Sequence, residues 1–196
     1  EHTVVEEQLR RNKRDLIRLE KALAIVKQVG LITQRQLEYH LANQVSLAMA
    51  AVFDDPYQLK VTFEEKRGRT EVQLTFCRRG IECFPIGSVG GGVLNVASFS
   101  LRAAYWSMRQ NNKVRNLLLL DEPFSQLKGE EANRRALEIV REISHRLELQ
   151  IIMVSDERVS RSEILENSDN VVYVSQDSDG VSELLQLVSG EKEVIS

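Results

Sequence analysis

Apolar residues recur every seven positions along the first thirty residues of the chain, in two rows that are offset by four. Two rows with this offset form the seam of a heptad repeat, which is typical of a helix that pairs with another helix. A single amphipathic helix on a globular core shows a similar pattern, and this segment alone fits both interpretations. The first row is Val5, Asn12, Leu19 and Val26, and the second row is Leu9, Leu16, Leu23 and Gly30.

Gly30 interrupts the two rows, and a helical pattern resumes over residues 34–52. Asp54-Asp55-Pro56 ends this second helical segment, because the residue before a proline is driven out of the α region. The sequence therefore predicts helix on both sides of Gly30, with a break at the glycine itself.

Two segments of alternating polar and apolar residues follow, over residues 57–63 and 72–76. Lys66-Arg67-Gly68-Arg69 lies between them and has the composition of a turn. Alternation on both sides of a glycine-containing turn predicts a β-hairpin, which residues 81–84 would extend.

Wholly apolar runs alternate with amphipathic helical segments in the second half of the chain. The apolar runs cover residues 117–120, 151–154 and 171–174. Short strands that are apolar throughout are typical of a parallel sheet with helices on both faces. The sequence therefore predicts an α/β fold with a mostly parallel sheet flanked by helices. The helical segments expected around these runs are residues 93–110, 132–147 and 157–165.

Composition narrows the class of protein. The chain has 196 residues, of which 42% are hydrophobic, so a packed core is expected. Its 26 Lys and Arg against 29 Asp and Glu give a formal net charge of -3, which excludes a protein that is basic throughout. Cys77 and Cys83 lack the spacing of zinc ligands, and their small number fits a reducing cytosol.

Targeting signals are not visible in the sequence. No apolar run approaches the ~20 residues of a membrane span, so no membrane partner is expected. The chain begins at Glu1 rather than Met and shows no signal-peptide pattern, which is compatible with a fragment or a processed product. We therefore expect a cytoplasmic location.

Two acidic residues follow the first apolar run. Asp121 and Glu122 come directly after Leu117–Leu120, at the carboxyl end of a predicted parallel strand, where open α/β sheets bind their ligands. Asp121 could hold Mg²⁺, and Glu122 could orient or deprotonate an attacking water. This is a Walker B pattern, although a strand that ends in a solvated acidic turn has the same sequence pattern.

Gly90-Gly91-Gly92 directly precedes the helix predicted to start near Val93. Glycines at a helix N-terminus expose backbone N–H groups to an anion, and the helix dipole favours negative charge there. A glycine triplet by itself also fits a flexible loop. The sequential order of glycine loop, helix, apolar strand and Asp-Glu pair makes the ligand-binding interpretation the stronger one.

This order of segments resembles the C-terminal half of an ABC-type ATPase, and in detail the SMC-like ATPases. A helical arm and a β-hairpin before the glycine loop are similar to the SbcC branch, the ATPase subunits of DNA double-strand-break repair nuclease complexes. The matching segments are Val89–Val93 with residues 95–102 for the signature motif and its helix, Asp121-Glu122-Pro123 for the Walker B motif, Ser125-Gln126-Leu127-Lys128 for the D-loop, and residues 151–156 for the last strand.

The resemblance implies a domain organisation and a set of partners. Residues 1–29 would be a coiled-coil stub, the returning arm, and residues 30–196 the C-terminal lobe of an ABC ATPase head. The chain contains no G-x-x-x-x-G-K-[ST] loop, which in the family lies in an N-terminal segment beyond a long antiparallel coiled coil. The implied partners are that N-terminal half, a second head in an ATP-dependent dimer, a nuclease subunit of SbcD type, and DNA.

The resemblance also implies a function with ATP and Mg²⁺ as cofactors, namely half of an ATP-hydrolysing head in DNA repair or recombination. The chain would be an ATPase only when combined with the N-terminal half. Asp121 would bind Mg²⁺, and Glu122 would be the catalytic carboxylate. The residues implied at the nucleotide or the dimer interface are Gly90, Gly91, Gly92, Gln126, Lys128 and Asp156.

Three positions depart from the family pattern. Gly90 replaces the signature serine, Lys128 replaces the D-loop aspartate, and Asp156 replaces the switch histidine. The first and third departures each remove a phosphate-contacting side chain, which favours an ATP-gated DNA clamp or tether with little or no hydrolysis. Glu122 favours hydrolysis, because binding alone does not require it. An unrelated α/β domain is the third alternative.

Overall fold

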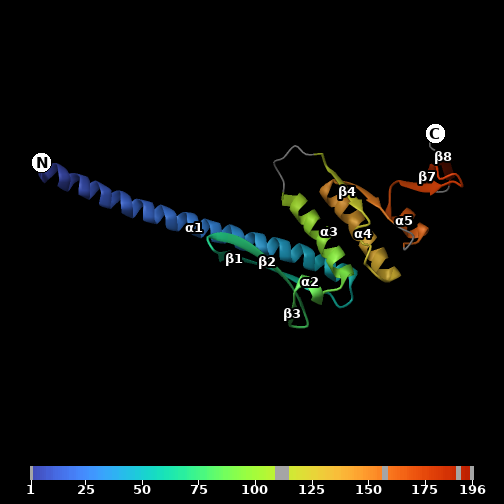
Figure 1. Ribbon diagram of the computed structural model, residues 1–196, viewed down its shortest axis with the longest axis horizontal. Helices are drawn as coiled ribbons and strands as arrows, with labels where there is room; N and C mark the ends of the chain where they lie inside the picture. The colour runs from blue at the N-terminus through green and yellow to red at the C-terminus, as the bar shows by residue number, and fades with distance from the viewer. Residues whose placement is uncertain (1, 109–114, 156–158, 189–190, 195–196) are drawn as a thin grey trace. The chain divides into compact units, whose positions relative to one another are not determined.

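The computed structural model describes residues 2–108, 115–155, 159–188 and 191–194 (Figure 1). The chain divides into two compact units. The first contains residues 1–41 and 61–73, and the second contains residues 42–60 and 74–196.

One long helix, α1, runs from His2 to Val52 without interruption. The break that we predicted at Gly30 is wrong, because the helix passes through this residue. A glycine inside a helix costs only about 1 kcal/mol relative to alanine, which the hydrogen bonds of a long helix tolerate. The predicted end of the helix before Asp54-Asp55-Pro56 is confirmed.

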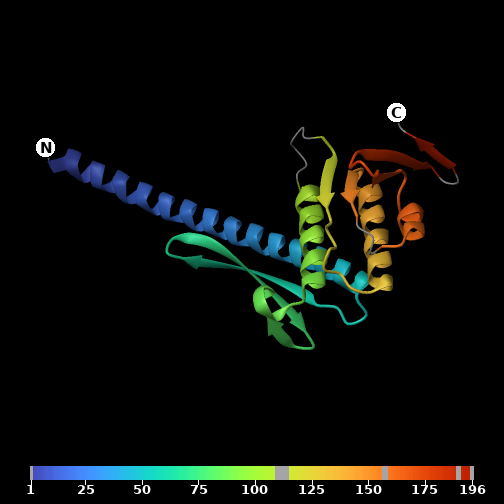
Figure 2. The same ribbon diagram turned by 45° about the vertical axis from the view of Figure 1, so that its right-hand side comes forward.

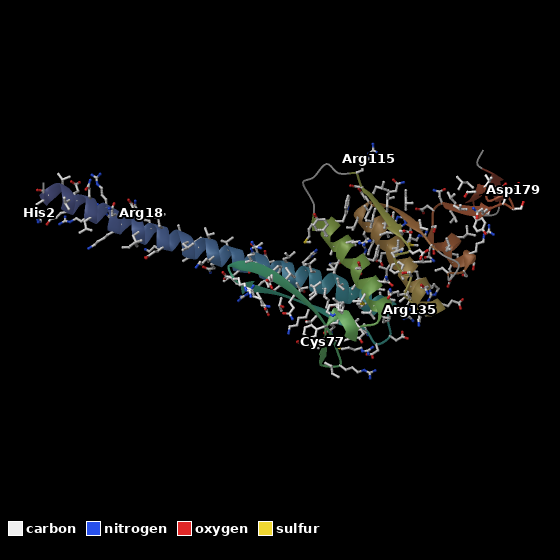
Figure 3. All side chains as sticks on the ribbon, viewed as in Figure 1. His2, Arg18, Cys77, Arg115, Arg135 and Asp179 are labelled. Carbon is white, nitrogen blue, oxygen red and sulfur yellow. The ribbon has the colours of Figure 1, made fainter. Side chains whose placement is uncertain are left out.

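The apolar rows of α1 are exposed along its N-terminal part, where side chains project around the helix (Figure 3). Leu16, Leu19 and Val26 expose 58%, 68% and 67% of their surface. In the described residues, this seam therefore has no cover. No helix that the structure describes is both long and apolar enough to cross a membrane.

A three-stranded sheet in the order β1-β2-β3 follows α1 (Figure 2). Its strands are β1 (Gln58–Lys66), β2 (Arg69–Arg78) and β3 (Ile81–Cys83). The turns Arg67-Gly68 and Arg79-Gly80 have positive φ at both residues, which is the geometry of the tight type I′ hairpin turn. The predicted hairpin and its extension are confirmed.

Side chains of α1 hold the backbone of β1 within each unit. In the first unit, the Phe63 N–H donates to Glu38 Oε1 at 2.9 Å. In the second unit, the Leu59 N–H donates to Ser46 Oγ at 3.0 Å. These bonds satisfy backbone groups that the sheet itself leaves unpaired at this edge.

The core of the second unit lies between two helices and a pair of parallel strands (Figure 2). The strands β4 (Leu117–Asp121) and β5 (Gln150–Val154) pair in parallel, as the sequence predicted. Phe99 on α3 (Gly91–Met108) and Val140 on α4 (Glu130–Leu147) pack against one face of this pair. The cluster contains Phe99, Leu120 and Val140, with Leu118, Phe124, Ile139, Ile143, Ile151 and Met153 against it.

The third apolar run does not join a parallel sheet, and our prediction of a mostly parallel sheet is wrong here. This strand, β6 (Val171–Gln176), pairs antiparallel with β7 (Ser182–Val188), which pairs antiparallel with β8 (Glu191–Val194). A tight turn joins β6 to β7, where Asp177 Oδ1 accepts the Val181 N–H at 2.8 Å. Such a turn permits an antiparallel neighbour, whereas a parallel one requires a long crossover.

Two short helices complete the second unit. The first, α2 (Pro85–Ser88), contains non-helical backbone at Ile86 and Gly87 and precedes the glycine triplet. The second, α5 (Arg161–Asn167), begins at Arg161 because Ser160 and Glu163 form a reciprocal capping box. The helix predicted over residues 157–165 is therefore displaced toward the C-terminus.

Ion pairs join the start of α4 to the segment that follows α1. Arg135 binds Asp54 Oδ1 at 2.8 Å and Glu131 Oε1 at 2.8 Å. Hydrogen bonds lower the pKa of Glu131 from 4.5 to about 2, and the bond from Arg134 contributes more than the bond from Arg135. Stability from this depressed pKa is complete above the unfolded-state value and is lost as the pH falls toward 2.

We predict that Glu131→Gln makes the fold less sensitive to acid. Between about pH 6 and about pH 3, the thermal unfolding midpoint of the native chain should fall more than that of the variant. In this range the unfolded native chain takes up a proton at Glu131, whereas the folded chain, with a pKa of about 2, keeps the carboxylate ionised. Thermal unfolding followed by circular dichroism measures this difference. Glu130→Gln, at the exposed neighbouring position, is the control and should decline like the native chain. Equal declines in the native chain and the Glu131 variant would contradict the prediction.

Candidate functional site

The two acidic residues of the predicted site lie at the carboxyl end of β4. Asp121 is the last residue of this strand and is paired with Val154 of β5. Its side chain is exposed and has no ion pair or hydrogen bond among the described residues. Two unengaged carboxylate oxygens at a strand end fit Mg²⁺, which proteins commonly bind through one or two carboxylates together with phosphates and water.

Glu122 turns the chain sharply out of the sheet. Its φ of 39° lies in the left-handed region, which costs a non-glycine residue roughly 1–2 kcal/mol. The Glu122 N–H donates to Val154 O at 3.1 Å, and the Glu122 carbonyl accepts the Ser125 N–H at 3.1 Å. The neighbouring strand therefore fixes this strained residue, and such fixed strain is common at functional sites.

The other non-glycine residues with positive φ have structural explanations. Arg67 and Arg79 lie in the hairpin turns, and Glu148 is the C-cap of α4. Among the described residues, Glu122 is therefore the one non-glycine residue with positive φ that lies neither in a hairpin turn nor at a helix cap. This feature strengthens the interpretation of Glu122 as a functional residue.

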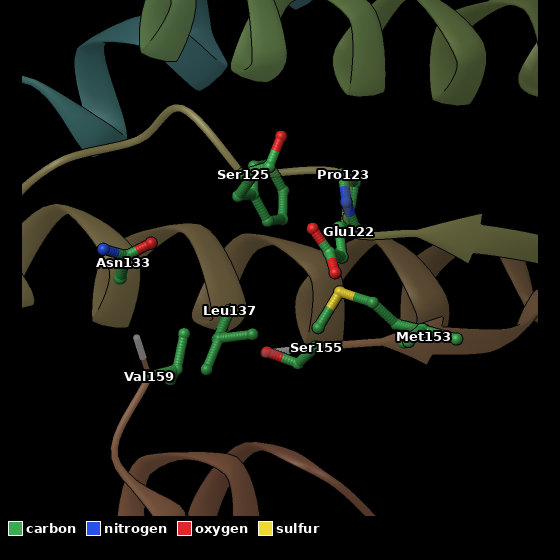
Figure 4. Close-up of a pocket in the computed structure, with 10 residues that line it drawn as sticks. Glu122, Pro123, Ser125, Asn133, Leu137, Met153, Ser155 and Val159 are labelled. Atoms are coloured by element: carbon green, nitrogen blue, oxygen red, sulfur yellow. The ribbon is translucent and has the colours of Figure 1, made fainter. Parts of the chain in front are cut away.

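A small cavity of about 20 Å³, which has room for about one water molecule, lies beside Glu122 (Figure 4). Its lining combines the carboxylate of Glu122 with the hydroxyls of Ser125 and Ser155 and with apolar residues such as Met153. A carboxylate and hydroxyls around a small hollow could hold a water molecule and accept a proton from it. In the described part of the chain, no group of three or more His, Cys, Asp or Glu side chains could hold a metal ion.

The glycine triplet, residues 90–92 (the glycine loop), starts helix α3. Gly90 is exposed, and its carbonyl accepts the N–H groups of Val93 and Leu94 at 3.0 and 3.2 Å. The first N–H groups of a helix have no partner within the helix, so this end could donate to an anion. The glycine loop therefore lies at the start of a helix, as the sequence predicted, and its role in binding an anion stays a prediction.

Two of the three glycines pack against another segment, residues 122–129 (the β4–α4 loop). A Cβ on Gly91 would lie 1.5 Å from Gln126 Oε1, and a Cβ on Gly92 would lie 3.0 Å from the Gln126 carbonyl oxygen. A Cβ on Gly90 would meet nothing within 4 Å. Gly91 and Gly92 thus allow the two loops to approach closely, whereas Gly90 faces open space.

The structure brings some of the predicted site residues together. Gln126 contacts Gly91 and Gly92, and Asp121 and Glu122 are adjacent at the end of β4. Lys128 is exposed on the same β4–α4 loop as Gln126. Asp156 lies outside the described residues.

Asn95 is a residue of this region that our sequence analysis missed as a site residue. Its Oδ1 accepts the Gln126 N–H at 2.9 Å, across 31 positions of sequence. Asn95 lies on an apolar helix between Leu94 and Val96, and a half-buried amide needs a partner. This polar interruption was the signal that could have identified it, although not its partner.

We predict that Gly92→Ala destabilises the chain by about 1–3 kcal/mol, because its Cβ would press on the backbone of the β4–α4 loop. The nearest atoms are backbone atoms of Gln126 and Leu127, at 3.0 and 3.1 Å, so a side-chain rotation cannot relieve the contact. Gly90→Ala is the matched control and should leave stability almost unchanged. Urea unfolding compares the two variants, and equal midpoints would contradict the packing role of Gly92.

Sequence comparisons find no relative of the chain. No protein-family model matches it, and no curated protein sequence does.

Structure comparisons find Smc head domains. The Smc head domain with a coiled coil and joint from Pyrococcus yayanosii has a TM-score of 0.65 and 20% identity, over 87% of this chain and 31% of that chain. The SmcHead bound to the C-winged helix domain of ScpA has a TM-score of 0.61 and 17% identity, over 82% of this chain and 45% of that chain.

A third structure is the Smc head domain with an extended coiled coil bound to the C-terminal domain of ScpA, from Pyrococcus furiosus. It has a TM-score of 0.59 and 16% identity, over 84% of this chain and 40% of that chain. This chain therefore spans less than half the length of each of the three solved chains. At these identities the likeness shows the fold, and the chain has the mixed α/β fold found in Smc head domains.

Proposed function

We propose that the chain is the C-terminal half of an ATP-hydrolysing, SMC-like head of the ABC type that acts in DNA repair or recombination. The observation that carries this proposal is the exposed outer face of the parallel β4–β5 pair. This face ends at Asp121, so the surface that needs a cover is continuous with the predicted Walker B residue.

The outer face of the pair is apolar. Leu119 and Ile152 are neighbours in the register and expose 66% and 51% of their surface, and Val154 exposes 54%. Parallel strands occur almost only in sheets that are covered on both faces, and a two-stranded pair has little stability of its own. A second lobe that adds strands and covers this face would satisfy both requirements.

The exposed heptad rows of α1 support the same arrangement. An apolar seam that runs through Leu9, Leu16 and Leu23 is the surface that one strand of a coiled coil buries against its partner helix. In the proposed head, that partner is the outgoing arm, which leads from the lobe with the G-x-x-x-x-G-K-[ST] loop. Residues 1–29 are then the coiled-coil stub, and residues 30–196 the C-terminal lobe.

Each candidate residue has a role in this head. When bound, ATP would supply the phosphate groups and Mg²⁺ would supply Lewis acidity. The carboxylate of Asp121 would be a ligand of the Mg²⁺ ion. Glu122, held by the backbone of β5, would orient the attacking water and accept its proton. Gly90 would offer backbone N–H groups to the γ-phosphate of ATP bound on a second head, together with Gly91 and Gly92.

The Gln126 side chain lies over Gly91 and therefore affects the proposed contact between the glycine loop and the γ-phosphate. It would have to move aside or itself contact the phosphate when the second head binds. Gln126 and Lys128 would then lie at the interface between the two heads. Asp156, the third departure from the family pattern, follows β5 in the chain and would be a further residue at the nucleotide.

The proposed partners are the N-terminal half, a second head, DNA and one further subunit. The SbcC-like order of the arm and the hairpin favours a nuclease subunit of SbcD type. Two of the solved Smc heads are bound to parts of ScpA, so a ScpA-like subunit is the other candidate. The proposed location is the cytoplasm or the nucleoid.

An ATP-gated DNA clamp or tether is the second candidate function. The observation that favours it is the covered state of Gly91, since Gln126 occupies the space at the start of α3. Gly90 also offers no hydroxyl to a phosphate. Turnover by the complete head distinguishes a hydrolysing ATPase from a tether.

We predict that Glu122→Gln preserves ATP binding by the complete head and slows hydrolysis by ~10²–10⁴, because an amide is a far weaker base than a carboxylate. Asp121→Ala should instead weaken Mg²⁺-dependent binding. The measurement is steady-state phosphate release by this chain combined with the half that carries the phosphate loop. Hydrolysis at the native rate by Glu122→Gln would remove Glu122 as the catalytic carboxylate, and no turnover by the native head would favour the tether.

A further inference from the structure

We propose that Asn95 is a positioning residue, which locks the β4–α4 loop onto the glycine loop and thereby couples the two nucleotide sites of a head dimer. The lock itself is a property of this chain alone. Its effect on nucleotide turnover rests on the proposed function.

The first part of the lock is a hydrogen bond. Asn95 lies one helical turn after Gly91, so its side chain reaches past the start of α3 toward the β4–α4 loop. Its Oδ1 accepts the Gln126 N–H at 2.9 Å, which satisfies a backbone donor that forms no bond within its own loop. Deleting this acceptor would leave the Gln126 N–H without its partner.

The second part of the lock is the fit of backbone against backbone. A Cβ on Gly92 would lie 3.0 Å from the Gln126 carbonyl oxygen and 3.1 Å from the Leu127 Cα, which is closer than an ordinary contact with backbone atoms. Gly91 lies under the end of the Gln126 side chain. The contact therefore allows little sliding between the two loops, and Asn95 fixes their register.

The far side of the β4–α4 loop is also held. Asn133 of α4 is 7% exposed, and its Nδ2 donates to the Gly129 carbonyl at 2.9 Å and to the Leu127 carbonyl at 3.4 Å. Leu127 is itself buried, at 4% exposure. The loop is thus held by one amide side chain from α3 and another from α4.

Backbone hydrogen bonds continue the connection to the acidic end of β4. The Ser125 N–H donates to the Glu122 carbonyl at 3.1 Å, and the Leu127 N–H donates to the Phe124 carbonyl at 2.9 Å. A continuous series of short-range contacts therefore runs from Glu122 to Asn95 and the glycine loop. In this proposal, a displacement at either end of the series is passed to the other through these contacts.

The two ends of this series belong to different nucleotides in the proposed head dimer. Glu122 would act on the ATP held by its own head, and the glycine loop would contact the ATP held by the second head. Asn95 would therefore make the two sites respond together. Without its hydrogen bond, each site would respond to ATP on its own.

The lock can be tested without nucleotide. Asn95→Ala should speed hydrogen exchange of the Gln126 amide at least tenfold in the full chain, and Asn95→Asp, which keeps an acceptor, should retain slow exchange. Ser98→Ala, at an exposed position on the same helix, is the control and should change nothing at Gln126. Exchange at the native rate in the alanine variant would overturn the lock.

The coupling is tested in the complete head through the dependence of hydrolysis on ATP concentration. A coupled pair of sites gives a Hill coefficient that approaches about two, and Asn95→Ala should lower it toward about one. Asn95→Asp should restore the native value. Faster exchange at Gln126 with an unchanged Hill coefficient would overturn the coupling. If the native head bound no ATP, the proposed function and the coupling would both fail, whereas the exchange result would still decide the lock.

Discussion

The parallel pairing of β4 with β5 is the interaction on which the rest of the second unit depends. Its register sets Leu120 into the core with Phe99 and Val140, and leaves Leu119 on the opposite, exposed face. The same register brings Asp121 to the strand end. One pair of strands therefore determines where the core, the uncovered face and the acidic site lie.

The close approach of the glycine loop and the β4–α4 loop is the second constraint. It explains Gly92 by packing, since a Cβ there would lie 3.0 Å from the Gln126 carbonyl oxygen, whereas a Cβ on Gly91 would first meet the mobile end of the Gln126 side chain. It also changes the interpretation of the glycine triplet, because only at Gly90 would an added Cβ meet no other atom within 4 Å. Steric requirement and anion binding are compatible at one helix end, because the N–H groups and the Cβ positions of a helix point in different directions.

Local patterns in the sequence predicted the elements that depend on local interactions. The hairpin followed from alternation around Arg67-Gly68, and the end of α1 followed from Pro56. The parallel strand before Asp121 was predicted because its composition is typical of a buried strand. Gly30 was misjudged, since its small local cost does not break a helix of 51 residues.

Features that depend on distant partners could not be predicted in the same way. The strand β6 is as apolar as a parallel strand, but the turn at Asp177 makes it pair antiparallel with β7. The contact of Gln126 with Gly91 joins residues 35 positions apart and leaves no periodic signal. Asn95 was visible as a polar residue on an apolar helix, but its partner is defined only by the tertiary fold.

Calorimetric titration with ATP and Mg²⁺ tests the central claim most directly, on this chain alone and on this chain with the half that carries the phosphate loop. We expect micromolar binding only with both halves, because this sequence lacks the loop and lysine that cradle a triphosphate. Leu119→Lys should prevent assembly and binding, and Val172→Lys, at an exposed position of β6, should not. Micromolar binding of ATP by this chain alone would contradict the claim.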